Sequence, residues 1–367
     1  MSSEPHQRIF GLDLVRALAA VIVVFSHADD LLDEHWPRNP GASAMDGVDL
    51  FFVLSGFLIG NILIRLSYAS EIPWYRRLLD FWQRRWLRTL PNYYLFLVIN
   101  IIMVYLGWSM GLLNVNTLAY FAFLQNLIIP LDLFFWESWS LAVEEWFYLL
   151  FPLLLVVLAW WRSPKWGFLL ATLVMITVPI VLRYPAMDAV GTSFMLDLLV
   201  RKIVVLRFDT IGYGVLMAWL VFHVPQVFSQ RRVELFGMGA LLLVTAILLR
   251  SDDGLLYKGT LFLVLSGWSM AMMLPFMAGW HKVGRWAVVV SFMSRISYAL
   301  YLVHMPVRSV YLNLMPGMSV EVSLLLYVGY WAVSIALAAV VYHYWEKPFM
   351  AMRDGLSARI LRQEAAP

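Results

Sequence analysis

Long apolar runs dominate this sequence and limit the folds that it can adopt. A helix needs about 20 mostly apolar residues to cross the hydrocarbon core of a bilayer, and about ten runs come close to that length. Of the residues, 62% are hydrophobic and 14% are charged, whereas about 25% are charged in a soluble domain. The sequence therefore predicts an all-α, polytopic membrane protein with about ten transmembrane helices. The expected spans are residues 10–27, 47–66, 91–108, 139–161, 166–183, 205–222, 234–250, 259–280, 286–311 and 322–342.

Two further segments have a different character. Residues 73–90 are rich in arginine and aromatic residues, which predicts an interfacial helix that leads into the third span. Residues 115–130 are apolar but short, which predicts a half-helix or a re-entrant segment buried in protein. We find no internal repeat and no soluble domain. We therefore expect one membrane domain over residues 1–350 and a short cytoplasmic tail over residues 351–367.

The distribution of basic residues predicts the orientation in the membrane. Most Lys and Arg side chains fall in the segments that are cytoplasmic if both termini lie inside, as the positive-inside rule requires. The net charge of +3 then reflects these loops, and no nucleic-acid partner is expected. The chain has no cysteine, and its histidines lack the paired spacing of metal ligands, so no metal is expected.

An arginine and a histidine share one face of the first span. Arg16 and His27 are eleven residues apart, which is about 20° past three full helical turns and about 16 Å along the axis. Side chains that can carry charge are costly in a bilayer, and a functional role is the default hypothesis for them. Asp13 lies three residues before Arg16 and can form a salt bridge with it.

Polar side chains of two other spans are expected at the depth of His27. With the predicted orientation, Glu144 and Glu145 of the fourth span and His304 and Arg308 of the ninth span all fall near the outer leaflet. A neutral imidazole with a carboxylate partner is a general base poised near neutral pH. We therefore expect His27 to deprotonate an acceptor hydroxyl, with one of the two glutamates beside it. Arg308 can stabilise a developing oxyanion.

A second candidate site lies on the cytoplasmic side. Arg85 and Arg88 are three residues apart and share a helix face. Guanidinium groups bind phosphate well, but the same pair also suits anionic lipid headgroups. Spacing alone leaves both interpretations open.

Six segments, in this order, resemble acyltransferase family 3, the integral-membrane O-acyltransferases of bacteria. The resemblance covers about residues 8–350. The segments are Arg16 to His27, Asp49 to Ile59 (DLFFVLSGFLI), Arg85 to Arg88 (RWLR), Trp139 to Tyr148 (WSLAVEEWFY), Ser297 to His304 (SYALYLVH), and Glu346 to Pro348 (EKP).

The resemblance implies a function and roles for four residues. It implies a ten-helix core that transfers an acyl group, usually acetyl, from cytoplasmic acyl-CoA to a hydroxyl of a cell-surface or periplasmic glycan. It implies that His27 is the catalytic residue, paired in a motif with Arg16, and that Arg85 and Arg88 contact the donor. It also implies a bacterial cytoplasmic (inner) membrane protein, here the stand-alone form without a C-terminal hydrolase-like domain.

The donor and His27 are then expected on opposite sides of the membrane. We expect the pantetheine arm of acyl-CoA to thread between the helices, along a path lined by Arg16. Several alternatives stay open: a small or lipid acceptor, a lipid-linked glycan, a succinyl-CoA donor, a covalent acyl-histidine, and, from another class, a proton-coupled transporter.

Overall fold

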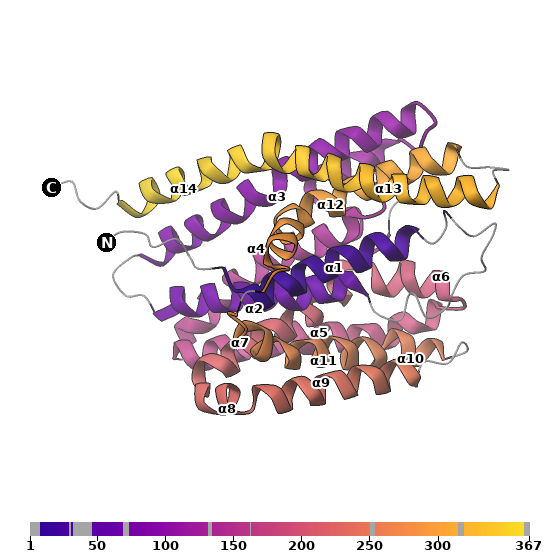
Figure 1. Cartoon of the computed structure of the whole chain (residues 1–367). Helices are drawn as coiled ribbons and strands as arrows, with labels where there is room; N and C mark the ends of the chain where they lie inside the picture. The colour runs from indigo at the N-terminus through magenta and orange to yellow at the C-terminus, as the bar shows by residue number, and fades with distance from the viewer. Residues whose placement is uncertain are drawn as a thin grey trace. The chain divides into compact units, whose positions relative to one another are not determined.

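The computed structural model describes residues 8–28, 31, 46–68, 73–130, 134–161, 163–249, 254–282, 284–314 and 319–362. These residues form helices and turns and contain no strand (Figure 1). Among them, 8 helices are long and apolar enough to cross a membrane, which confirms the all-α, polytopic prediction. The long helices are α1 (Phe10–Ala28), α2 (Gly47–Tyr68), α3 (Trp74–Tyr105), α4 (Ser138–Trp161), α5 (Pro164–Ala186), α11 (Leu261–Ala278), α12 (Ala287–Leu314) and α13 (Val320–Val341).

Two of the predicted spans are shorter helices. The spans expected at 205–222 and 234–250 correspond to α7 (Phe208–His223) and α9 (Arg232–Leu248), with 16 and 17 residues. At about 1.5 Å per residue, each covers about 25 Å, less than the hydrocarbon core of about 30 Å. The eight long helices and these two account for the ten apolar runs.

Two sequence predictions differ from the structure. The expected interfacial helix 73–90 and the third span are one helix, α3, which continues through Pro91. Residues 115–130, expected as a half-helix or a buried re-entrant segment, instead form a 3-10 helix, η2 (Val115–Ala122), followed by turns, and Val115 and Ile128 are exposed. Asn114 begins η2 with a capping box, and Phe123 ends it in the left-handed conformation. Local capping therefore outweighs apolar composition in this segment.

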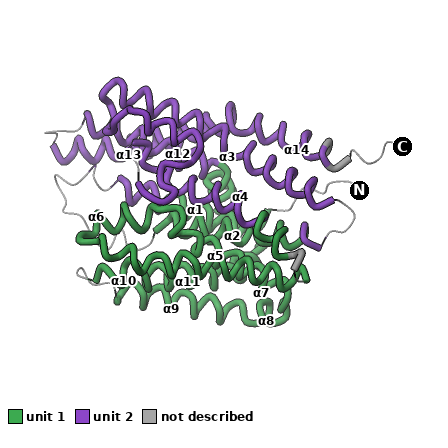
Figure 2. Tube along the Cα trace, turned by 180° about the vertical axis from the view of Figure 1, so that it is seen from behind, with its two compact units in different colours: residues 1–21, 46–65, 153–295 green, residues 22–45, 66–152, 296–367 purple. Residues whose placement is uncertain are grey.

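The described residues divide into two compact units, which Figure 2 colours green and purple. Unit 1 comprises residues 1–21, 46–65 and 153–295, and unit 2 comprises residues 22–45, 66–152 and 296–367. The boundaries fall within the helices α1, α2, α4 and α12. His27 therefore belongs to unit 2, whereas Arg16 on the same helix belongs to unit 1.

In unit 1, α11 packs against α7 and α9, and α7 also packs against α5. Helix α2 approaches α7 closely, because Gly56 and Gly214 leave no side chain at the crossing: a Cβ at either residue would lie 2.0 Å from a backbone oxygen of the other helix. The shorter elements of this unit are η3 (Met187–Ala189), α6 (Ser193–Leu196), η4 (Asp197–Arg201), η5 (Val204–Leu206), α8 (Pro225–Gln230) and α10 (Leu255–Gly259).

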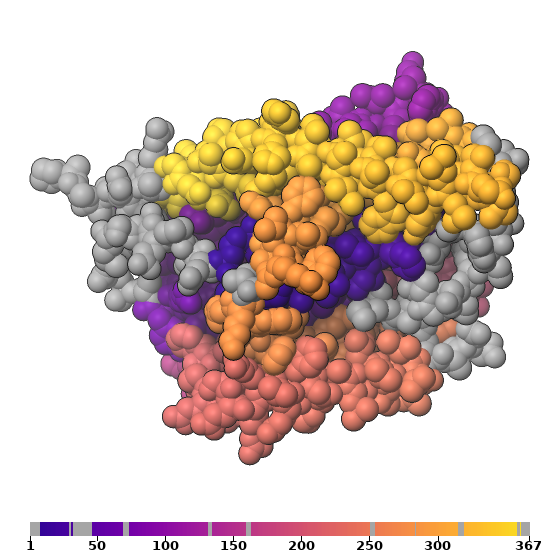
Figure 3. Space-filling model, viewed as in Figure 1, coloured from indigo at the N-terminus to yellow at the C-terminus, as the bar shows by residue number. Residues whose placement is uncertain are grey.

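In unit 2, α13 continues through the π-helical turn η6 (Tyr342–Glu346) into α14 (Lys347–Arg362), which packs along α3. Figure 3 shows α13 and α14 as one continuous surface band. Leu325 and Val328 of α13 are 72% and 64% exposed, as expected for a helix in contact with lipid. Helix α14 begins inside the predicted membrane domain and extends through most of the predicted tail, while residues 363–367 lie outside the described residues.

Candidate active site

His27 lies in the last turn of α1 and is half-buried. Its Nδ1 lies 2.9 Å from the carbonyl oxygen of Val23, one turn earlier. A carbonyl oxygen can only accept a hydrogen bond, so Nδ1 of the neutral imidazole carries the proton and Nε2 carries the lone pair. This tautomer leaves Nε2 as the atom that can act as a base.

Helix α12 contributes two predicted side chains to the same place. His304 is fully buried, and its Nε2 lies 3.4 Å from Nδ1 of His27, with the ring centroids 5.2 Å apart. Arg308, one turn further along, donates from Nε to the backbone carbonyl of His27 at 2.8 Å. The structure thus brings together His27, His304 and Arg308, as the sequence predicted.

A hydroxyl pair connects α12 to the start of α4. Tyr301 donates from its hydroxyl to the carbonyl oxygen of Glu137 at 2.8 Å, and its oxygen lies 2.5 Å from Oγ of Ser140. The ring of Tyr301 lies 5.8 Å from that of His304. Sequence analysis assigned no role to Tyr301, Ser140 or Glu137. The i, i+3 spacing of Tyr301 and His304 was the available signal, because it places both side chains on one face of α12.

Glu144 and Glu145 are placed with α3. Glu145 is buried and accepts a hydrogen bond from Oγ1 of Thr89 at 2.6 Å. Arg85 of α3 interacts electrostatically with both glutamates, and its guanidinium lies 5.5 Å from the ring centroid of Tyr148. Glu145 therefore does not take the expected place beside His27: Thr89 holds its carboxylate on the α3 side.

Contacts along α12 show how far the histidine pair lies from the group around Glu145. Tyr298 donates from its hydroxyl to the backbone carbonyl of Thr89 at 2.8 Å, which places it at the glutamate group. His304 is six residues further along the helix, about 9 Å in axial rise. The candidate site of unit 2 therefore has two polar centres along α12, one at the histidine pair and one around Glu145 and Arg85.

The predicted donor-side arginines lie on α3 in unit 2. Arg85 and Arg88 are both half-buried. The neighbouring Arg84 donates to Oγ of Ser357 at 3.1 Å, so α14 packs beside this part of α3. A basic face of this kind can bind phosphate groups.

In unit 1, Asp13 joins three polar side chains. Its Oδ1 accepts from Arg8 at 2.9 Å and from Ser294 at 2.8 Å, and Arg16 lies 3.9 Å away. The predicted i, i+3 ion pair between Asp13 and Arg16 is therefore present. Because Asp13 is 5% exposed, these contacts neutralise a buried carboxylate.

The aspartate of the DLFFVLSGFLI segment has a structural partner in the same unit. Asp49 of α2 forms an ion pair with Arg207, and Arg183 forms one with Asp209. Both arginines are fully buried. Such charges are stable inside a membrane protein only when they are paired.

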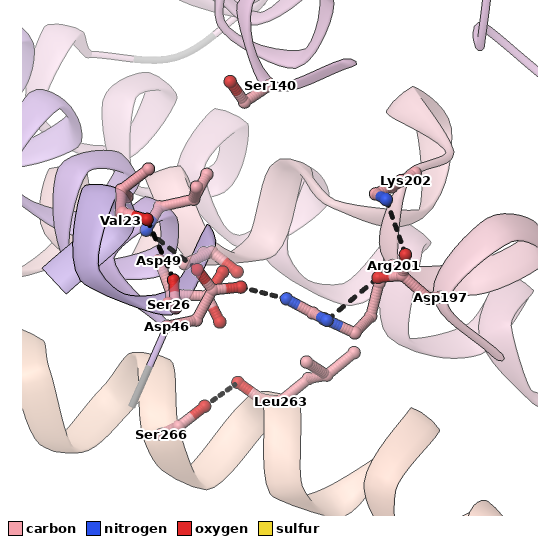
Figure 4. Close-up of polar contacts among 12 residues, drawn as sticks. Val23, Ser26, Asp46, Asp49, Ser140, Asp197, Arg201, Lys202, Leu263 and Ser266 are labelled. Atoms are coloured by element: carbon pink, nitrogen blue, oxygen red, sulfur yellow. Dashed lines mark hydrogen bonds and ion pairs between the residues drawn. The ribbon is translucent and has the colours of Figure 1, made fainter. Parts of the chain in front are cut away.

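A second group of ion pairs lies at the start of α2. Figure 4 shows the guanidinium group of Arg201 between the carboxylates of Asp46 and Asp197. Lys202 contacts Asp197 from the other side at 2.5 Å. These pairs tie the irregular segment around η4 to the beginning of α2 within unit 1.

Among the described residues, no group of three or more His, Asp or Glu side chains could hold a metal ion.

Comparison with known proteins gives a family match over nearly the whole chain. The model of the family Acyl_transf_3, described as an acyltransferase domain, matches residues 9–343. The match includes α1, α3, α4 and α12, which carry the polar groups described above.

Curated relatives match over shorter stretches of their own length. YrhL of Bacillus subtilis is 36% identical over 169 residues, 42% of this chain and 25% of that protein. The peptidoglycan O-acetyltransferase OatA of Listeria monocytogenes is 34% identical over the same lengths. The O-acetyltransferase OatA of Staphylococcus aureus is 27% identical over 329 residues, 81% of this chain and 50% of that protein. The chain thus spans half or less of these relatives, and no solved structure matches it.

Proposed function

This chain belongs to the Acyl_transf_3 family of acyltransferases, and from that premise we propose that it is a membrane O-acetyltransferase. We propose that it transfers an acetyl group from acyl-CoA to a hydroxyl of a glycan outside the cytoplasm. The names of the OatA relatives support an O-acetyl transfer and, for Listeria monocytogenes, a peptidoglycan acceptor. The same chemistry applies to a small or lipid-linked acceptor or to succinyl-CoA.

The contact of His27 Nδ1 with the carbonyl oxygen of Val23, 2.9 Å away, is the observation that carries this proposal. With the proton on Nδ1, held by the carbonyl of Val23, Nε2 accepts the proton of an acceptor hydroxyl. The hydroxyl oxygen then attacks the thioester carbonyl, and a tetrahedral intermediate with a negatively charged oxygen forms. Collapse of the intermediate breaks the carbon–sulfur bond and returns the proton from His27 to the CoA thiolate. The products are the O-acetyl ester and free CoA.

Arg308 and His304 support this step through His27. Arg308 holds the carbonyl of His27 at 2.8 Å, which orients the last turn of α1 and places a positive charge close to the reacting group. His304 packs its ring beside the imidazole and limits the rotation of the base. Both residues therefore position His27 for the transfer.

The donor is assigned to the basic face of α3. We propose that Arg85 and Arg88 bind the phosphates of CoA on the cytoplasmic side. Glu144 and Glu145 interact electrostatically with Arg85. In this proposal they belong to the donor-binding part of the site. In this proposal both termini lie in the cytoplasm, and the protein is located in a bacterial inner membrane.

A pair of histidine variants tests the proposed base. We expect His27→Ala to lower acetyl transfer in proteoliposomes by at least about a hundredfold, the contribution typical of a general base. The matched control is His281→Ala, because His281 is exposed in a segment outside the long helices, and it should transfer at the normal rate. A His27→Ala protein that folds and transfers normally would contradict the proposal. A labelled acetyl group trapped on His27 would instead indicate a covalent acyl-histidine.

Sealed vesicles test whether the donor and the acceptor bind on opposite sides of the membrane. Acetyl-CoA is supplied on one face and the glycan acceptor on the other. Transfer across the membrane supports the threaded donor, and a requirement for both substrates on one face would exclude it. Arg85→Gln should raise the KM for acetyl-CoA, whereas Arg231→Gln, an exposed arginine in unit 1, should leave it unchanged. If Arg85→Gln leaves acetyl transfer unchanged but weakens binding to anionic vesicles, Arg85 contacts lipid headgroups and not the donor.

A further inference from the structure

Two buried oxygen atoms at the start of α4 have no hydrogen-bond donor. Glu137 and Gln125 are 3% and 4% exposed. The Oε1 atom of each is shielded from solvent and has no hydrogen-bond partner among the described residues. Folded proteins pair nearly all such buried atoms, so each exception needs an explanation.

The orientation of Gln125 follows from its other contacts. Its amide nitrogen donates to the carbonyl oxygen of Ser138 at 3.4 Å and lies 3.2 Å from the hydroxyl of the same residue. Because a carbonyl oxygen only accepts hydrogen bonds, this contact identifies the nitrogen of the amide. The amide oxygen is therefore the free end, and it is an acceptor like the carboxyl oxygen of Glu137.

Backbone strain occurs at the same two places. Phe123 and Phe135 are the two non-glycine residues with positive φ among the described residues, at 57° and 46°. Each lies two residues before one of the free acceptors, Gln125 and Glu137. Bulky residues rarely adopt this conformation, and strain of this kind concentrates at ligand and active sites. The ring of Tyr93 packs 4.1 Å from that of Phe123 and 5.4 Å from that of Phe135, which holds both strained turns.

The free acceptors are connected to the histidine pair inside unit 2. Tyr301 donates to the carbonyl of Glu137, and three residues later on α12 His304 contacts His27. Three residues correspond to about 4.5 Å along the helix. Glu137 is therefore linked through Tyr301 to the face of α12 that carries His304, whose ring lies 5.8 Å from that of Tyr301.

We propose that Glu137 and Gln125 form a subsite that accepts hydrogen bonds from hydroxyl or amide N–H groups of the glycan acceptor. The inference rests on the proposed function and names the residues that select its acceptor. Both free atoms are acceptors, so they fit a ligand that is rich in neutral donors. One carboxyl group and one amide are too few to hold a divalent cation, which takes six or more oxygen ligands.

The test replaces each acceptor by an apolar side chain of similar size. The probes are an acetyl-CoA donor and a pentamer of β-1,4-linked N-acetylglucosamine. We expect Glu137→Leu and Gln125→Leu each to raise the KM for the pentamer at least about tenfold, the loss typical of one or two hydrogen bonds. The KM for acetyl-CoA should not change. Glu234→Leu is the matched control, because Glu234 is an exposed glutamate in unit 1, and it should leave both values unchanged.

A stability measurement separates a binding role from a structural one. Removing the buried Oε1 atom, which has no partner, should cost little stability. Glu137→Leu also loses the hydrogen bond of the carboxyl to the backbone, so it should melt close to the wild-type temperature in detergent. A much lower melting temperature would show that Oε1 has a structural partner and would overturn the subsite. An unchanged KM for the pentamer would also overturn it.

The acceptor itself provides a second comparison. A glucose pentamer offers hydroxyl groups but no amide N–H. If either Glu137 or Gln125 binds the amide N–H, its leucine variant should raise the KM for the N-acetylglucosamine pentamer more than the KM for the glucose pentamer. Wild-type protein that transfers no acetyl group to any glycan would refute the proposed function. Normal wild-type transfer with unaffected variants would refute the subsite alone.

Discussion

His304 Nε2 lies 3.4 Å from Nδ1 of His27, the same nitrogen that lies 2.9 Å from the carbonyl oxygen of Val23. The proton on Nδ1 therefore faces two acceptors, one on its own helix and one on α12. Both contacts are made at Nδ1, which restrains the imidazole and keeps its lone pair on Nε2. His304 is fully buried, so it acts through His27 and positions the base.

Replacing His304 should weaken catalysis without abolishing it. We expect His304→Phe to lower kcat about 10- to 100-fold, because the base keeps its contact with Val23 but loses its second restraint. The KM for acetyl-CoA should stay the same. His223→Phe is the control, since Nδ1 of His223 also lies 2.9 Å from a carbonyl one turn earlier, that of Trp219, but in unit 1. A His304→Phe enzyme as inactive as His27→Ala would instead make His304 a chemical participant.

The sequence was informative wherever a periodic pattern determines the structure. Long apolar runs predicted the helices, and helical spacing predicted that His304 and Arg308 share a face and that Arg16 pairs with Asp13. It could not predict which neighbour each side chain meets. One of Glu144 and Glu145 was expected near His27, but the direction of Glu145 depends on the packing of α3, which brings Thr89 to its carboxyl group.

Two kinds of contact could not be predicted from a single sequence. Glu137 acts through a backbone carbonyl and a buried oxygen, and neither property has a sequence pattern. The pairing of Asp49 with Arg207 joins residues 158 positions apart, so it depends on tertiary structure. The end of η2 at Phe123 likewise depends on aromatic packing against Tyr93.

The close crossing of α2 and α7 gives a prediction about stability. A Cβ at Gly214 would lie 2.0 Å from the carbonyl oxygen of Val53, whereas a Cβ at Gly237 of α9 has nothing within 4 Å. Gly214→Ala should therefore destabilise the protein by several kcal/mol, because backbone must move. Gly237→Ala should stabilise it by up to about 1 kcal/mol, through its higher helix propensity. Thermal melting in detergent measures both, and equal melting temperatures would contradict the close packing.

The buried pair of Asp49 and Arg207 gives a prediction about charge. Asp49→Leu leaves the fully buried Arg207 without its carboxylate, which should cost about 3–5 kcal/mol. Combining Asp49→Leu with Arg207→Met removes both charges and should recover most of that loss. Melting temperatures of the two single variants and the double variant form a thermodynamic cycle. If the double variant loses as much stability as the two single variants together, the two side chains do not stabilise each other.

The buried carboxyl of Glu137 gives a prediction about pH. Burial raises the pKa of Glu137 from 4.5 to about 8, so the folded protein holds a proton that the unfolded chain releases above pH 4.5. The free energy of unfolding should therefore fall as the pH rises from about 4.5 to about 8, and should be independent of this group outside that window. Ser140 and Tyr301 donate hydrogen bonds to the backbone carbonyl of Glu137 and not to its carboxyl, and His304 lies next to Tyr301.

Glu137→Gln isolates the contribution of this carboxyl, because the other titrating groups stay in both proteins. The variant should lose less stability than the wild type between pH 5 and pH 8, about the window set by the two pKa values. Melting temperatures across this range in detergent provide the measurement. Parallel curves for the two proteins would show that Glu137 is ionised in the folded state. In that case a buried cation or a bound water would have to stabilise its carboxylate.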